Sequence, residues 1–580
     1  MPIAADPSPD SDVDLLVVGS GAGGLSAAVT AAQLGLKVLV LEKEAQYGGT
    51  TAWSGGWMWI PRNPLARAAG IEEEAGRPEA YLRHELGARF EADRVAAYLR
   101  EGPRMVEFFR QHSALQFIDG NGIPDFHGRN PAAVTGGRSV CAAPFDGRRL
   151  GRRIEQLKPP LAETTLWGMG IASGAELRHF LNALRSPRSF AYVAGRVLRY
   201  WRDCLRHGRG MRLVNGHALV GALAASAFEA GVEVRVKAPV RRLLIENGRV
   251  AGVQLGAAGA GDGPVTLRSR CGVVLACGGF PHDEARKREL LPHAPTGREH
   301  WSAASRGNTG DGLRLGEQAA GVVVRDLPSA AALAPVSLVP RADGSLAHFP
   351  HLIERAKPGL IAVDRRGQRF VNEADSYHDF MGALLATTAP GEPAEAWLLC
   401  DHDFIRHYGL GAVKPAPMPL GPWLRKGYLK RGQTLAALAQ SCGLPVETLQ
   451  TTVQRYNAAA QTGRDADFGK GETPYNRVQG DAAVGTANPC MAPLVRAPFY
   501  AVKVQPGSLG TFAGLRANAQ AQVLDGEGRP VPGLYVAGND MNSLMGGHYP
   551  SGGITLGPAM TFGFIAAHHA AGVPLSDRTT

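Results

Sequence analysis

The sequence predicts an α/β fold in two parts, a doubly wound α/β domain and an α+β domain inserted into it. Residues 13–42 read as strand, glycine turn, helix and strand, and both strands are continuous apolar runs typical of buried parallel strands. From about 283 to 505 the composition is more mixed, with prolines and aromatic residues along the segment. Residues 506–580 then read as a hairpin, a buried strand and an apolar helix. The first part is therefore predicted to be Rossmann-type, and the inserted part to be a capping or substrate domain.

The expected domain boundaries follow from these changes along the 580 residues, a length that favours more than one domain. The first segment of the Rossmann-type domain is expected at 1–282, with a helical excursion at about 65–230. The inserted catalytic domain is expected at 283–505, and the first domain is completed by 506–580. Two or three strands with a turn at Asn247–Gly248 are expected near the end of the first segment.

The chain carries 62 Lys and Arg against 52 Asp and Glu, a formal net charge of +10. A basic surface favours binding of anionic small molecules, a membrane surface or nucleic acid. The alternative is a basic surface that contacts solvent and binds none of these. The densest basic segment, 184–213, interleaves arginines with aromatic residues and predicts a solvated helical excursion, with peripheral membrane contact as the alternative. We expect no nucleic-acid partner.

The seven cysteines show no CxxC or Cys/His spacing, so we expect reduced cysteines and no metal site. The first residues, "MPIAADPSPDSDVD", lack the regions of a signal peptide, and no apolar run is long enough to span a bilayer. The expected location is cytoplasmic, with peripheral membrane association as the alternative.

A GxGxxG motif lies between the first strand and the first helix, in "VVGSGAGG", with Gly19, Gly21 and Gly24 as its glycines. Glycines permit the tight turn and allow the backbone to approach a pyrophosphate at the helix N-terminus. Glu42 ends the second strand, where a carboxylate accepts a ribose hydroxyl. This pattern predicts dinucleotide binding, and Glu42 argues against a 2′-phosphate.

A second glycine- and hydroxyl-rich stretch, "YGGTTAWSGGWMWIP", follows the acidic residue and favours FAD over NAD. An NAD site does not need such a loop, whereas a flavin with its ribityl chain does. The residues of this loop expected to contact the cofactor are Gly49, Thr50, Thr51, Ser54, Gly55 and Gly56.

Seven ordered motifs resemble those of the FAD-dependent fumarate reductase/succinate dehydrogenase flavoprotein superfamily. They are "GSGAGG", "GGTTAWSGG", "VVLACGGF", "GNTGDG", "RFVNE", "PFYAV" and "GLYVAGN". The resemblance implies non-covalent FAD, because Gly49 stands where members with covalent flavin have a histidine. It implies further cofactor contacts at Ala22, Lys43, Val240, Gly278, Asp311, Asn539, Gly553, Thr555 and Leu556.

The groups that clamp a dicarboxylate in fumarate-type enzymes are replaced in this sequence. Tyr377 and Pro550 stand at the places of two arginines, and Gly510 stands at the place of a histidine. A phenol and a proline cannot form the bidentate contacts that two guanidinium groups make with carboxylates. The sequence therefore argues against fumarate as the substrate.

Two tyrosine segments resemble the 3-ketosteroid Δ1-dehydrogenase branch instead: "RFVNEADSYHD" with Tyr377, and "YPSGGITLGPAMTFGF" with Tyr549. The resemblance implies desaturation of a cyclic ketone at its α,β carbons, with a hydride passing to flavin N5 and a proton to Tyr377. By the same resemblance, the Tyr549 hydroxyl and the Gly553 N–H hold the ketone oxygen. The reduced flavin would then be reoxidised by an external acceptor such as a quinone, a dye or oxygen.

Phe126 departs from the pattern of the steroid enzymes, which use a further tyrosine in a segment similar to "GIPDFHGRN". His127 and His378 are expected near the substrate with Phe126, each with a structural role as the alternative. A hydrophobic cyclic ketone is expected as substrate, either a steroid or a smaller ketone. A flavin-dependent reductase of activated alkenes and a non-catalytic flavin-binding protein stay open as further alternatives.

Overall fold

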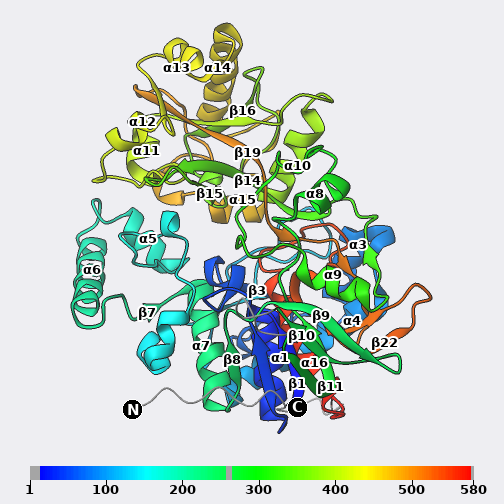
Figure 1. Cartoon of the computed structure of the whole chain (residues 1–580). Coiled ribbons are helices and arrows are strands. Elements are labelled where there is room, and N and C mark those ends of the chain that lie inside the picture. The colour runs from blue at the N-terminus through cyan, green and yellow to red at the C-terminus, as the bar shows by residue number, and fades with distance from the viewer. Residues whose placement is uncertain (1–12, 257–263, 576–580) are drawn as a thin grey trace.

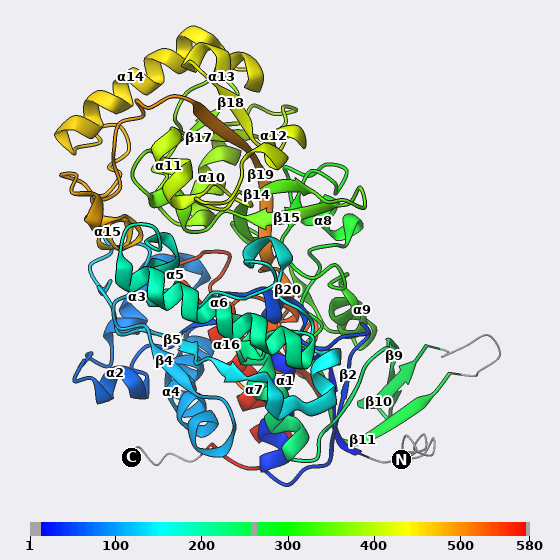
Figure 2. The same ribbon diagram turned by 90° about the vertical axis from the view of Figure 1, so that its left-hand side faces the viewer.

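Two β-sheets organise the chain, one in the lower lobe and one in the upper lobe of Figure 1 (Figures 1 and 2). The computed structural model describes residues 13–256 and 264–575. The lower lobe contains the sheet built on the first strand, and the upper lobe contains the sheet built on residues 331–511. The predicted boundary at residue 505 falls inside a strand, β19 (Phe499–Thr511), which pairs with strands of the upper sheet.

The lower sheet has the predicted strand–turn–helix–strand unit at its centre. Strand β1 (Val13–Val18) pairs in parallel with β2 (Val38–Leu41) on one side and with β11 (Thr266–Leu275) on the other. All residues of β1 and β2 are buried, as continuous apolar runs require in a parallel sheet. The sheet continues through β8 (Glu233–Arg235) at the β2 edge, and through β22 (Pro530–Val536) and β21 (Gln522–Leu524) at the β11 edge.

Helices α1 (Ala22–Gln33) and α16 (Leu556–Ala570) pack against each other beside this sheet. Helix α7 (Asn215–Glu229) packs against α1 in turn. The chain closes the lower lobe with its last helix, so residues from both ends of the sequence form one core (Figure 1).

The expected hairpin near the end of the first segment is present. Strands β9 (Val240–Glu246) and β10 (Arg249–Leu255) are antiparallel and turn at Asn247–Gly248, and β10 pairs with β11. Both turn residues have positive φ, which favours asparagine and glycine at these positions.

The upper sheet is mainly antiparallel, as expected for an α+β domain. Its order is β15 (Leu346–Pro350), β14 (Ala331–Pro340), β19, β17 (Ala396–Cys400) and β16 (Leu360–Asp364). Its helices are α10 (Tyr377–Thr387), α11 (His402–Tyr408), α12 (Gly421–Arg425), α13 (Leu435–Cys442), α14 (Val446–Thr462) and α15 (Pro474–Gln479). Of these, α10 and α15 carry residues toward the lower lobe.

The helical excursion contains α2 (Pro64–Ala68), α3 (Arg77–Leu86), α4 (Ala92–His112), α5 (Ala175–Leu181) and α6 (Pro187–His207). Helices α5 and α6 stand at the left of Figure 1, and Figure 2 shows α6 running across the face of the molecule. Within residues 13–256 and 264–575, no helix combines the length and apolarity needed to cross a bilayer.

Candidate active site

One cleft of about 2880 Å³ runs along the carboxyl ends of β1, β2 and β22 and continues between the two lobes. Ligand pockets usually occupy about 300–1,000 Å³, so this cleft has room for an extended cofactor together with a substrate. The predicted cofactor residues that line it are Gly19, Gly21, Ala22, Glu42, Lys43, Gly49, Thr50, Thr51, Ser54, Gly55, Gly56, Val240, Gly278, Asp311, Asn539, Gly553, Thr555 and Leu556.

The N-terminus of α1 opens onto the cleft and suits a pyrophosphate. No side chain caps this helix at Gly21, and the Ala22 N–H is bonded to Thr51 Oγ1 at 3.0 Å. The remaining first-turn N–H groups and the positive end of the helix dipole are therefore available to an anion. Gly19 has φ +106°, and a Cβ there would collide with the Ala276 carbonyl oxygen, so only glycine fits this turn.

Glu42 and Lys43 occupy the end of β2 beside that turn. The Glu42 carboxylate accepts hydrogen bonds from the Ser20 N–H and hydroxyl and from the Glu44 N–H, which fixes its orientation. Lys43 forms an ion pair with Asp311 and donates to the Thr309 hydroxyl at 2.8 Å. The assignment of both residues to the cofactor stays a prediction. Glu42 lies directly after β2, where an acid that binds a ribose is expected.

The loop that holds Tyr549 is fixed by backbone bonds to the lower lobe. The Pro550 carbonyl accepts from the Tyr81 hydroxyl at 2.7 Å and from the Phe126 N–H at 3.1 Å. The Gly553 carbonyl accepts from the Trp59 N–H at 3.2 Å. Gly553 has φ +97°, and a Cβ there would lie 2.7 Å from the Trp59 nitrogen, so a side chain is excluded at this position.

Tyr377 and Tyr549 meet in this cleft although they lie on different lobes. Their rings are edge-to-face with centroids 5.0 Å apart, and both residues are buried and line the cleft. Burial raises the pKa of Tyr377 well above its ordinary value, and the electrostatic influence of the neighbouring Tyr549 raises it further. Burial also raises the pKa of Tyr549 to about 12, while hydrogen bonds with Tyr377 and Thr555 lower it. Both tyrosines are therefore phenols at neutral pH.

Phe126 lies against both tyrosines and completes an aromatic wall. Its ring is stacked on Tyr549 with centroids 5.8 Å apart, and it meets Tyr377 edge-on at 5.7 Å. Phe126 lines the cleft, where it contributes apolar surface without a hydroxyl, and its contact with substrate stays a prediction.

His127 and His378 lie behind this wall, and Gly24 lies inside the glycine turn; none of these three described residues lines the cleft. His127 bonds Glu85 and Asp379 through its two ring nitrogens, and His378 Nδ1 accepts from the Leu333 N–H at 3.2 Å. A Cβ at Gly24 would collide with the Gly19 carbonyl, so this glycine serves close packing. Direct contact of either histidine with substrate stays a prediction.

The contacts of His127 predict a pH-dependent contribution to stability. Burial lowers its pKa, but the hydrogen bonds and charges of Asp379 and Glu85 outweigh burial and raise it to about 10. A histidine with a raised pKa contributes stability that is complete below its ordinary value of about 6.5 and is lost as the pH rises through about 10. His127→Gln should lower the free energy of unfolding by about 1–3 kcal/mol at neutral pH.

Urea denaturation of both proteins at several pH values measures this contribution. The difference between wild type and His127→Gln should shrink above pH 10. A difference that stays constant across the alkaline range would show that the ion pairs of His127 do not stabilise the fold.

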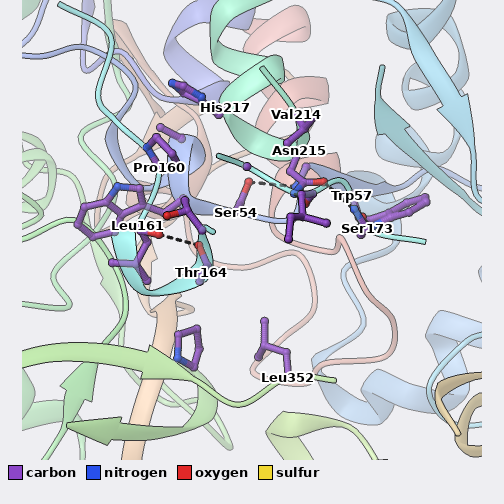
Figure 3. A pocket seen from close by; sticks show the side chains of 18 of the residues that line it. Ser54, Trp57, Pro160, Leu161, Thr164, Ser173, Val214, Asn215, His217 and Leu352 are labelled. Atoms are coloured by element: carbon purple, nitrogen blue, oxygen red, sulfur yellow. Dashed lines mark hydrogen bonds between the residues drawn. The ribbon is translucent and has the colours of Figure 1, made fainter. Parts of the chain in front are cut away.

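Sequence reasoning missed two parts of the cleft wall. Tyr475, on α15, lines the cleft with its ring 4.4 Å from that of Phe126, centroid to centroid. Figure 3 shows the second part: Leu161 and Thr164, the N-terminus of α7 at Asn215, and Leu352 of the upper lobe lie around one cavity. Nothing in the local sequence at 159–171 distinguishes it from an ordinary surface segment, because it becomes cleft wall only through the packing of the lobes.

Comparisons with known proteins agree with this geometry. A family model described as FAD binding domain matches residues 14–556. A protein of Sinomonas cyclohexanicum named 4-oxocyclohex-2-ene-1-carboxylate 5-dehydrogenase is 38% identical over 559 residues, covering 96% of this chain and 93% of that protein. A 3-oxosteroid 1-dehydrogenase of Mycobacterium tuberculosis is 36% identical over 574 residues, covering 97% and 98%.

Comparison with solved structures also finds similarity to a ketone dehydrogenase. The 3-ketosteroid Δ1-dehydrogenase of Sterolibacterium denitrificans, in complex with 1,4-androstadiene-3,17-dione, superimposes with a TM-score of 0.89 at 35% identity, covering 97% of this chain and 99% of that one. A flavocytochrome c3 fumarate reductase shares the fold with a TM-score of 0.63 at 21% identity, covering 97% of this chain and 79% of that one. FAD is the cofactor, as the sequence predicted. The chain belongs to the FAD-dependent fumarate reductase/succinate dehydrogenase flavoprotein superfamily, in the branch of the 3-ketosteroid Δ1-dehydrogenases.

Proposed function

We propose that this FAD-dependent oxidoreductase desaturates a cyclic ketone at the carbons α and β to the carbonyl group. The observation that carries the proposal is the buried contact of Tyr377 with Tyr549 in the cleft that the dinucleotide turn also lines. Two hydroxyl groups in an apolar pocket suit a neutral ketone, and arginines are absent from the places where the fumarate-type enzymes need them.

The chain's own residues would act at two positions of the substrate, the ketone oxygen and the α-carbon. The Tyr549 hydroxyl and the Gly553 N–H would donate hydrogen bonds to the oxygen, where negative charge develops as the α-proton leaves. In its phenolate form, Tyr377 would accept this proton and become a phenol. Bound FAD supplies the acceptor for the hydrogen and the electron pair that leave the β-carbon. Burial of both tyrosines keeps water from these groups.

Anaerobic titration of the FAD-loaded protein with cyclic ketones tests the proposal. A suitable panel contains a steroid 3-ketone and 4-oxocyclohex-2-ene-1-carboxylate, because the names of the two relatives described above cover both types of substrate. Loss of the oxidised flavin spectrum on addition of a ketone is the expected result. A protein whose flavin is not reduced by any of these ketones, and which in its reduced form is reoxidised by fumarate or an enone, would be an alkene reductase instead.

We also propose that helix α6 contacts a membrane surface. Leu198, Trp201 and Leu205 follow one another at helical spacing on one face, with 72%, 49% and 88% of their surfaces exposed. Exposed arginines, among them Arg199 and Arg202, accompany them. Apolar and basic groups together on one exposed helix favour an anionic bilayer, from which a hydrophobic ketone or a quinone could enter the nearby cleft.

Flotation with vesicles of anionic phospholipid measures this contact. The double variant Leu198→Asp/Leu205→Asp should bind about tenfold or more weakly, since burying one leucine is worth about 1.5–3 kcal/mol. The control is Val495→Asp, which changes an exposed apolar residue of the upper lobe. Equal binding by all three proteins, or no binding by the wild type, would exclude α6 as a membrane contact.

A further inference from the structure

The Tyr475 side chain places a hydroxyl group in the cleft for which residues 13–256 and 264–575 provide no partner. The residue is buried, its ring lies against Phe126, and it lines the cleft with Tyr377 and Tyr549. Within the described residues, no hydrogen bond reaches its hydroxyl, and this oxygen is also not among the fully buried atoms without a partner. The hydroxyl is therefore open to the cleft, where a bound molecule would supply the partner that buried polar groups require.

An amide network connects Tyr475 rigidly to the segment that precedes Tyr377. The neighbouring residue Asn476 is fully buried, and its amide nitrogen donates to the Ala374 carbonyl and to Asp375 Oδ1, each at 3.0 Å. Its oxygen accepts from Asn372 Nδ2 at 2.9 Å. The two tyrosines are thus held on one scaffold of the upper lobe, and this fixes their relative positions against the loop of Tyr549.

The loop that carries Phe126 approaches α15 closely. A Cβ at Gly128 would lie 2.9 Å from Pro474 Cδ, so a glycine is required where the two segments pass each other. The Phe126 para carbon lies beside Gly552, at 3.5 Å from where a Cβ of that residue would be. Phe126 therefore reaches the cleft with a ring edge that has no hydroxyl, and Tyr475 adds a hydroxyl to the same wall.

A buried positive charge lies near this wall. The guanidinium of Arg355 is fully buried, and it bonds three carbonyl oxygens, those of His351, Glu373 and Asp375. No carboxylate of the described residues forms an ion pair with it. Burial raises the pKa of Tyr475, whereas the charge of Arg355 lowers it. The charge of Arg355 therefore offsets part of the effect of burial on this hydroxyl.

We propose that Tyr475 is a further catalytic residue, whose hydroxyl donates a hydrogen bond to the bound ketone substrate from the wall that Phe126 shares. This inference rests on the proposed function, because it takes the cyclic ketone as the molecule in the cleft. It assigns to the upper lobe two substrate-contacting tyrosines, Tyr377 and Tyr475, opposite Tyr549 of the lower lobe.

A hydroxyl exchange tests the proposal in the FAD-loaded enzyme. Tyr475→Phe should lower kcat/KM for the ketone that the wild type oxidises by about 10–100-fold, as expected for one lost hydrogen bond to a substrate. Tyr475→Phe/Phe126→Tyr returns a hydroxyl to the same wall and should recover at least tenfold of the loss. Flavin content and Tm, recorded for each variant, should stay at wild-type values.

The matched control is Tyr456→Phe. Tyr456 is also a buried tyrosine whose hydroxyl has no partner among the described residues, but it lies in the second hydrophobic cluster of the upper lobe, away from the cleft. The kcat/KM of the Tyr456→Phe enzyme should equal that of the wild type.

Three results would overturn the proposal. Wild-type kcat/KM in Tyr475→Phe would refute it and leave the proposed function intact. A loss in Tyr475→Phe that is accompanied by a lower Tm and is not recovered by Phe126→Tyr would assign Tyr475 to packing. A wild type inactive toward all ketones of the panel would refute the proposed function itself, and this inference with it.

Discussion

Tyr377→Phe is expected to lower kcat for ketone desaturation by about 10²–10⁴-fold, the usual contribution of a general acid or base. The substitution removes only the phenol oxygen, which as phenolate would accept the α-proton, and the ring remains to pack against Phe126 and Tyr549. KM should change little, because the ketone oxygen keeps its hydrogen-bond donors. Steady-state turnover with the ketone identified by titration and an artificial electron acceptor measures the effect.

The flavin spectrum provides the control for Tyr377→Phe, because the variant should bind as much FAD as the wild type. Tyr456→Phe, in the second hydrophobic cluster, shows what the loss of a buried tyrosine hydroxyl costs elsewhere in the same lobe. A Tyr377→Phe enzyme with kcat within a few-fold of the wild type would remove Tyr377 from the role of proton acceptor.

Tyr549→Phe is expected to lower kcat/KM by about 10²–10³-fold, the effect of removing one donor from a site of developing oxyanion charge. Its hydroxyl would hold the ketone oxygen in the ground state and bind it more strongly as the α-proton leaves. We therefore expect KM to rise and kcat to fall together, in contrast to Tyr377→Phe. The Gly553 N–H would remain as the second donor, so residual activity is expected.

The separation of kcat from KM decides the role of Tyr549. A raised KM with unchanged kcat would show that the hydroxyl binds the ground state and the transition state equally. Wild-type values of both constants would exclude contact between Tyr549 and the reacting carbonyl group. Flavin content again serves as the internal control, since Leu556 and the helix that begins there are unchanged.

The lower lobe could be predicted from the sequence because its signals are local. Continuous apolar strands and a glycine turn with an acidic residue after it specify β1, α1 and β2 within some thirty residues. The meeting of Tyr377 with Tyr549 followed from the resemblance of two distant motifs, and the structure brings the two rings into contact.

The direction in which neighbouring side chains point could not be predicted from the sequence. His378 follows Tyr377 at the start of α10, and successive residues of a helix point about 100° apart, so one faces the cleft and the other packs on Phe512. His127 follows Phe126 and turns away from it toward Glu85 and Asp379. Adjacent residues thus have separate roles, because the backbone directs their side chains to different sides.

Tyr475 could not be found from the sequence for a different reason. It lies in "TPYNR", a threonine-capped helix start with proline at the first position, which by itself indicates local structure only. Its place in the cleft depends on the contacts of Asn476 with residues 372–375, which are set by the packing of the upper lobe. Long-range packing of this kind leaves no periodic signal in the chain.

The pH dependence of anaerobic flavin reduction by a cyclic ketone tests the central claim most directly, because no external electron acceptor takes part and reoxidation of the flavin does not affect the rate. Burial raises the pKa of both Tyr377 and Tyr549, so phenolate is scarce at neutral pH and becomes more abundant as the pH rises. The single-turnover rate of the wild type should therefore increase with pH by up to about tenfold per unit. Tyr377→Phe should be slow and nearly independent of pH. A wild-type rate that does not change with pH, or a Tyr377→Phe rate that rises as the wild type does, would contradict proton transfer to Tyr377.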